Sequence, residues 1–214
     1  MLLIGALAST SGSLVLLNLD FRLTDQTHYS FMAWNIVLAW IPVLLSLAML
    51  GVVRWGGGSA AVIPLLCAWV LFLPNAPYLA TDLVHLGNPI SPPAADAVMF
   101  AAFAITGVYL GLMSAWFACV ALRRIWRPRT ALRVINVSLA LCGVGIYLGR
   151  VVQVNSWEVL TAPATVIHEA AGHIGDARGW AVSIVIAGIS AAALVGAYHL
   201  LARVLDGTGQ GSPG

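Results

Sequence analysis

The sequence predicts an all-α fold, a polytopic transmembrane helical bundle of about six spans with a broken third span and an outer interfacial helix. Of the 214 residues, 60% are hydrophobic and 8% are charged, and the mean hydropathy is +0.93. So few charges cannot cover a soluble globule of this size. Six apolar windows are long enough to cross about 30 Å of hydrocarbon. Short links between them indicate one integral membrane domain over residues 1–206 and a disordered tail over residues 207–214.

Each of the six apolar windows is assigned to one membrane span, in chain order. The first has no basic residue before its apolar core and no small-x-small cleavage site after it, so we expect a retained helix and not a signal peptide. The three cysteines lie inside apolar windows without metal-type spacing and are expected to be buried packing residues. The windows cover residues 2–19, 31–53, 60–79, 97–122, 131–151 and 180–205.

The arginines predict the orientation of these spans. The chain has no lysine, and seven of its ten arginines, five of them between residues 122 and 133, fall on one side of a six-span arrangement. The positive-inside rule then places both termini in the cytoplasm. All acidic residues except Asp206 fall on the outer side. The basic loop is expected to be a topology signal or an anionic-lipid contact, and no nucleic acid is expected as a partner.

The third window breaks where polar side chains begin. Residues 60–73 make only about 21 Å of helix, so the chain must continue past Pro74 and Pro77 at membrane depth. Each proline removes a backbone donor and kinks or interrupts the helix. We expect Asn75 to cap a new helical segment, which Gly87 ends.

Four polar side chains of this segment fall on one face at helical spacing. Asn75, Tyr78, Asp82 and His85 lie within about a quarter of the circumference at 100° per residue. Ionisable groups at the edge of a bilayer are costly and call for a partner or a function. The face is either a site that binds a polar head group or relays protons, or a hydrogen-bond network that holds the helix ends together.

The outer end of the fifth window supplies partners for this face. Arg150 is the only cation at this depth, so we predict an ion pair with Asp82 or Glu158. Recognition of a phosphate or carboxylate is the alternative use of its guanidinium. Asn35 is expected to bond across helices, with a ligand contact as the alternative. The candidate binding residues are Asn35, Asn75, Tyr78, Asp82, His85, Arg150, Asn155, Trp157 and Glu158, and the candidate catalytic residues are Asp82 and His85.

The segment His168-Glu-Ala-Ala-Gly-His173 is similar to a zinc-protease motif but differs in spacing. The motif needs histidines four residues apart, whereas these are five apart, about 140° on a helix. We therefore expect no metal site, and no cofactor. Apolar residues alternate here with polar ones at helical spacing, which predicts an interfacial helix on the outer leaflet over residues 166–176.

Two glycine pairs repeat one pattern in neighbouring spans. Gly107-Val-Tyr-Leu-Gly111 is followed in the next window by Gly145-Ile-Tyr-Leu-Gly149. The pattern indicates small-residue packing notches, with a trace of an inverted repeat as the alternative.

Three sets of motifs occur together along the chain: Trp34-Asn35 with Leu38-Ala-Trp-Ile-Pro42, Leu73-Pro-Asn-Ala-Pro-Tyr78 with Asp82, and Gly145-Ile-Tyr-Leu-Gly-Arg150 with Asn155-Ser-Trp-Glu158. In this combination the chain resembles a bacterial membrane family catalogued as domain of unknown function 1361. The resemblance covers about residues 22–163. It implies a multi-span protein of the bacterial inner (plasma) membrane and no particular activity. The family usually has Asn-Ser-Trp-Asp where this chain has Glu158.

Three functions fit these observations, and they leave open whether the chain is an enzyme. The first is an extracytoplasmic polar pocket that binds or modifies a lipid head group or small polar solute, with Asp82 and His85 handling protons and Arg150 contacting an anion. The second is a non-catalytic scaffold or partner subunit of another membrane protein. The third, an ion-coupled transporter, is disfavoured because the inner halves of the spans hold few polar groups besides Asn136 and Ser138. The expected partners are membrane lipid and a small polar or anionic ligand.

Overall fold

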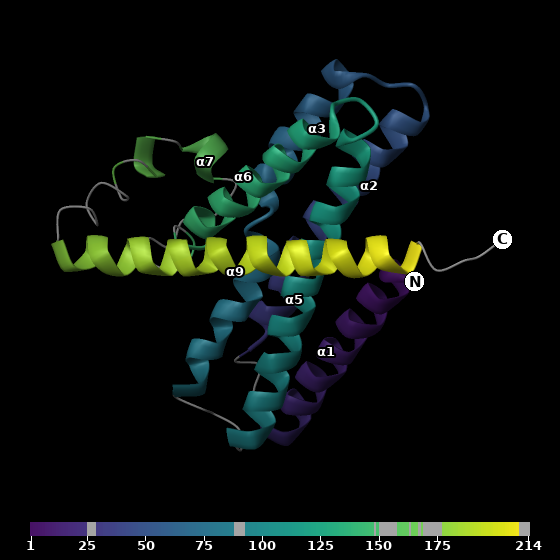
Figure 1. Cartoon of the computed structure of the whole chain (residues 1–214). Helices are drawn as coiled ribbons and strands as arrows, with labels where there is room; N and C mark the ends of the chain where they lie inside the picture. Colours follow the sequence, from purple (N-terminus) through teal and green to yellow (C-terminus); the bar gives the residue numbers. More distant parts are fainter. Residues whose placement is uncertain are drawn as a thin grey trace.

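The computed structural model of the chain is a bundle of α-helices (Figure 1). It describes residues 1–24, 29–87, 93–147, 149, 158–162, 164–166, 168 and 177–209, and none of these lies in a β-strand. In chain order the elements are α1 (Leu2–Thr24), α2 (Phe31–Arg54), α3 (Ser59–Phe72), α4 (Asn75–Tyr78), the 3₁₀ helix η1 (Leu79–Gly87), α5 (Pro93–Leu122), α6 (Pro128–Tyr147), α7 (Glu158–Thr161) and α9 (Ala177–Gly209).

The predicted spans are confirmed within the described part of the chain. Each helical stretch that is long and apolar enough to cross a membrane overlaps one of the six predicted windows. The agreement is expected, because the thickness of the hydrocarbon sets the length of apolar sequence that a span needs. The sixth stretch is tested only from residue 188 onward. The stretches are Leu2–Leu23, Phe31–Arg54, Ser59–Leu83, Ala94–Leu122, Pro128–Tyr147 and Gly188–Leu205.

The outer surface of the bundle is apolar. Large aliphatic side chains that face outward occur on α1, α2, α5, α6 and α9, an arrangement that a water-soluble monomer rarely shows. Exposure of these side chains to lipid tails carries no cost in free energy, because the tails are as apolar as leucine. The chain is therefore a multi-pass membrane protein. Examples are Ile4, Val15, Leu44, Ile105, Val137, Ile189 and Leu200.

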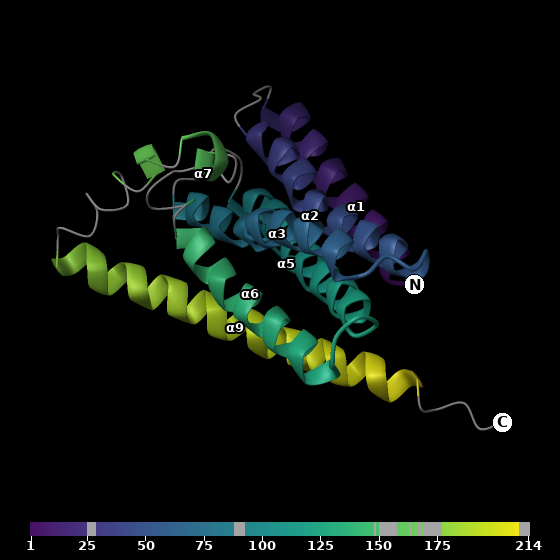
Figure 2. The same cartoon turned by 90° about the horizontal axis from the view of Figure 1, so that it is seen from above.

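The helices pack in an order that follows the chain only in part. α2 and α1 both lie along α5, whereas α9 packs chiefly on α6. Figure 1 shows α9 crossing the other helices, and Figure 2 shows α1 and α9 on opposite sides of the layer formed by α2, α3 and α5. α5 thus occupies the centre of the bundle.

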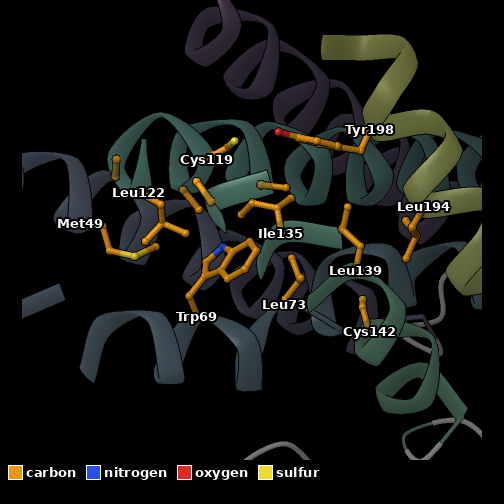
Figure 3. Close-up of a cluster of buried hydrophobic side chains, with 14 of the residues drawn as sticks. Met49, Trp69, Leu73, Cys119, Leu122, Ile135, Leu139, Cys142, Leu194 and Tyr198 are labelled. Atoms are coloured by element: carbon orange, nitrogen blue, oxygen red, sulfur yellow. The ribbon is translucent and has the colours of Figure 1, made fainter. Parts of the chain in front are cut away.

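Two hydrophobic clusters hold this arrangement together. One joins α1 and the first half of α2 to α4, η1 and the first half of α5. The other joins the last turns of α2 and α5 to α3, α6 and α9 around Trp69 (Figure 3). Trp69 is fully buried and its Nε1 donates to Ser114 Oγ at 3.3 Å, so the one polar atom of this large side chain is satisfied.

The cysteines follow the prediction at two positions of three. Cys119 and Cys142 are buried in the cluster around Trp69, as expected. Cys67 is exposed, so its assignment as a buried packing residue was wrong. A free cysteine behaves as a small hydrophobe, and it can therefore face lipid from the outer side of α3 as readily as it can face protein.

The arginine-rich connection between α5 and α6 lies beside the start of α3. Trp126 Nε1 donates to Ser59 Oγ at 2.9 Å. Arg54 ends α2 just before Ser59, so it lies at the same end of the bundle as the five arginines of residues 123–133. We call this end of the bundle the basic end. The structure agrees with the prediction that Arg54 and these five arginines lie on one side.

The structure describes only part of the predicted interfacial helix and of the predicted C-terminal tail. Of the predicted interfacial helix over residues 166–176, only Val166, which is buried, and His168, which is exposed, are described. α9 continues to Gly209, so helix extends into the first residues of the expected disordered tail.

Candidate polar site at the acidic end of the bundle

The third span is broken, as predicted, but Asn75 acts differently from the expectation. Pro74 occupies the position before α4, and Asn75 is the first residue of that helix. The Ala76 amide bonds to Leu73 O at 3.2 Å and not to Phe72 O, four residues back. Asn75 Nδ2 donates to Phe72 O at 2.9 Å. The side chain therefore satisfies the carbonyl left over from α3 instead of capping the new segment.

The segment after the break winds as a 3₁₀ helix, which changes which residues align. Residues three apart are in register in a 3₁₀ helix, so the backbone positions of Asp82 and His85 align. Asn75 and Tyr78 precede this change of winding and belong to α4. Nine residues of 3₁₀ helix exceed the usual three or four. Thr81 Oγ1 supports the winding by donating to Tyr78 O at 2.7 Å.

The two glycine motifs provide notches for the break. A Cβ at Gly107 would collide with Ala76 O and lie 2.8 Å from Leu79 Cβ. A Cβ at Gly111 would lie 3.3 Å from Pro77 Cδ, and one at Gly145 would collide with Pro74. Small-residue packing notches, the favoured reading of the motif, are confirmed for these three glycines. The broken segment is thus wedged between α5 and α6.

Asp82 and Asn35 meet as members of one site. The Asp82 side chain is 1% exposed, and Asn35 Nδ2 donates to its Oδ2 at 3.4 Å. The bond joins α2 to η1, residues 47 positions apart in the chain. Asn35 bonds across helices, as predicted, and the acceptor is the carboxylate of the candidate face.

A second buried pair lies at the same end, and the sequence analysis missed it. Tyr29 Oη donates to Asp96 Oδ2 at 3.3 Å, and Asp96 is 0% exposed. The Tyr29 ring packs edge-on against Phe100, with centroids 5.1 Å apart. The available signal was an acid one residue before the fourth predicted window, where a charge at the edge of a span calls for a partner.

A third acid, Asp20, completes this end of the bundle. It lies in the last turns of α1, close in sequence to the start of α2, and is 6% exposed. We call the end of the bundle that holds Asp20, Asp82 and Asp96 the acidic end. It is opposite the basic end along α2, which begins at one and finishes at the other.

The remaining candidate residues are described only in part. Tyr78 is half-buried on α4, and Glu158 is half-buried at the start of α7. The side chain of His85 lies outside the described residues, as do Arg150, Asn155 and Trp157, so the predicted ion pair of Arg150 stays a prediction. Among the described residues, no group of three His, Cys, Asp or Glu side chains is arranged to hold a metal ion.

The arrangement defines what the acidic end can do chemically. Asn35 and Tyr29 orient the two carboxylates by donating hydrogen bonds but bring no charge of their own. A buried carboxylate takes up a proton or pairs with a cationic or hydrogen-bond-donating group. The acidic end therefore suits either proton transfer or recognition of a polar ligand.

Comparison with known proteins adds the family. A family model described as "Protein of unknown function (DUF1361)" matches residues 34–193. This confirms the resemblance from residue 34 to residue 163 and extends it into α9 as far as residue 193. No curated protein and no solved structure matches the chain.

Proposed function

We propose that this chain, which belongs to the DUF1361 family of proteins of unknown function, binds a lipid head group or small polar solute at the acidic end of its bundle. The observation that carries the proposal is the Asp82 carboxylate, 1% exposed on a segment that follows a double-proline break. An ionisable side chain at the edge of a bilayer is costly and calls for a partner or a function. A carboxylate held beside a double-proline break, with Asn35 as a neutral donor, supports a binding role.

The chemistry of the ligand follows from the groups at this end. Asp82 accepts hydrogen bonds, so it suits a hydroxyl or ammonium group, and Arg150 suits a phosphate or carboxylate. A lipid head group carries both kinds of group at once. Asp82 and His85 are the titratable side chains through which any proton transfer on the ligand would pass. The arginine count predicts that this end is extracytoplasmic.

A second candidate function is a non-catalytic scaffold or partner subunit. This function is favoured because polar side chains of the broken segment stabilise its own backbone. Asn75 and Thr81 both donate hydrogen bonds to backbone carbonyls within the break. In this function the Asn35–Asp82 and Tyr29–Asp96 bonds serve only to join helices.

The test compares what the chain retains when it is extracted with its native lipid. Lipids and small polar molecules that accompany the wild type are compared with those that accompany Asp82→Asn, which keeps the shape of the side chain and removes its charge. Ser46→Ala is the control, because Ser46 is also buried and its hydroxyl bonds to Val43 O within α2, outside the broken segment. We expect one ligand to be enriched with wild type and Ser46→Ala and to fall tenfold or more with Asp82→Asn.

The outcomes separate the two functions. Equal retention by all three proteins, each monodisperse, contradicts the binding site. Loss of folded Asp82→Asn without any ligand enriched on the wild type favours the scaffold. Density beside Asp82 in a structure determined in native lipid supports the binding site directly.

A further inference from the structure

A cleft lies at the basic end, where α5 gives way to α6, far from the acidic end. It is a half-open depression with a volume of about 530 Å³. Three of its lining residues are arginines, and a threonine hydroxyl lies among them. The lining residues are Arg127, Pro128, Arg129, Thr130 and Arg133.

A second cleft of about 450 Å³ adjoins the first and is mostly apolar. The two share Arg127 and Thr130, which therefore stand at the junction between a cationic and an apolar compartment. The remaining lining residues of the second cleft are Ile125, Trp126 and Val134. We call the two together the arginine cleft.

The charge of the arginine cleft is not neutralised by the described part of the bundle. Arg127, Arg129 and Arg133 are exposed, and in the described chain their guanidinium groups form no ion pair or hydrogen bond with the protein. Every acid in the sequence except Asp206 is predicted on the opposite side of the membrane. Three neighbouring cations that have no carboxylate partner among the described side chains attract an anion, and an arginine fork matches phosphate oxygens.

The position of the arginine cleft relative to the membrane selects the kind of anion. One apolar span ends at Leu122 and the next begins at Pro128, so the connection lies where the hydrocarbon gives way to head groups. Trp126, a residue typical of that boundary, is fixed there by its bond to Ser59. An anion with an attached apolar chain fits this position and the two adjoining compartments.

We propose that the arginine cleft binds an anionic phospholipid. Its phosphate lies among Arg127, Arg129 and Arg133 with the Thr130 hydroxyl as a further donor, and the beginning of an acyl chain lies along Ile125, Trp126 and Val134. The proposal is independent of the acidic end, since the two sites share no residue.

The test is a lipid titration of the full chain in neutral detergent, with bound lipid counted by native mass spectrometry. Phosphatidylglycerol is compared with phosphatidylcholine on the wild type and on Arg127→Gln/Arg129→Gln/Arg133→Gln. Arg123→Gln/Arg124→Gln is the matched control, because both arginines are exposed on the same connection and do not line the cleft. We expect the triple variant to bind phosphatidylglycerol on the order of 100-fold more weakly, and the control to stay within about threefold of the wild type.

Three results would overturn the proposal. The first is equal affinity of the wild type for phosphatidylglycerol and phosphatidylcholine. The second is equal weakening in the triple variant and the control, since that would show a diffuse surface charge. The third is complete displacement of the lipid by inorganic phosphate at equal concentration, because the site would then recognise the free anion without using the apolar compartment.

Discussion

The charged side chains at the two ends of the bundle differ in burial and in hydrogen bonding. At the acidic end, Asp82 and Asp96 are buried and each accepts a hydrogen bond from a side chain of another element. At the basic end, the arginines of the connection between α5 and α6 are exposed and make no such bonds among the described residues. A buried charge depends on the surrounding fold, whereas an exposed charge is available to the membrane. The same kind of substitution should therefore have different consequences at the two ends.

The largest expected effect concerns the sidedness of the two ends. Ser30→Cys at the acidic end and Arg129→Cys at the basic end, each in a chain whose three native cysteines are replaced, should be labelled from opposite sides of the membrane. A membrane-impermeant maleimide should modify Ser30→Cys in intact spheroplasts and Arg129→Cys only in inside-out vesicles, because the positive-inside rule predicts that the arginine-rich side stays in the cytoplasm. Labelling of both cysteines from the same side would contradict the placement of the two ends on opposite sides of the membrane.

Packing at the break should give the next largest effect. Gly107→Val should lower the free energy of unfolding by about 3 kcal/mol or leave no folded chain, because the added atoms collide with Ala76 O and Leu79. Thermal unfolding in detergent measures it. The control is Gly51→Ala in the last turns of α2, where an added Cβ meets nothing within 4 Å. That change should be neutral or stabilise by about 0.5–1 kcal/mol.

Removal of a buried acceptor should cost less than a collision. Asp82→Ala should lower the free energy of unfolding by about 1–3 kcal/mol, because the Asn35 amide loses the acceptor that it has in the structure. Asp82→Asn should recover part of the loss. Chemical unfolding of the purified chain measures both, and an unchanged Asp82→Ala would mean that the Asn35 bond contributes nothing.

A neutral donor at the same end should matter less again. Tyr29→Phe removes the hydroxyl that donates to Asp96 and keeps the ring on Phe100. Interhelical hydrogen bonds of this kind average about 0.6 kcal/mol in a membrane protein, so we expect a loss of that size in the same unfolding measurement. A loss as large as that of Asp82→Ala would show that Asp96 is the more important of the two acids.

The smallest effect is expected at the basic end. Arg129→Gln should change the free energy of unfolding by no more than about 0.5 kcal/mol, because the side chain is exposed. A stability change comparable to that of Asp82→Ala would remove the contrast between the two ends.

The sequence predicts the spans well because their physical cause is local. The apolar length of each window is set by the bilayer, so the predicted and observed ends of the described spans differ by only a few residues. The break at Pro74 is equally local, since proline removes a donor wherever it lies. The glycine notches also follow from short spacing, although the sequence does not identify what fills them.

The parts that the sequence does not predict depend on distant contacts. The 3₁₀ winding of η1 follows a segment wedged against Gly107 and Gly145, which are far along the chain. The bond between Tyr29 and Asp96 joins residues 67 positions apart. Cys67 lies on a helix that is apolar on every side, so its sequence carries no signal that separates the face toward lipid from the face toward protein.

The glycine notches have a consequence for how a ligand would be recognised. Because the prolines of the break are seated against glycine backbone on α5 and α6, the turn of α4 that leads into the Asp82 segment has little room to shift. A ligand that meets a carboxylate already held in place loses little conformational entropy on the protein side, so its affinity comes from preorganisation and not from closure around it. Selectivity at such a site would depend on shape and charge fixed before the ligand arrives.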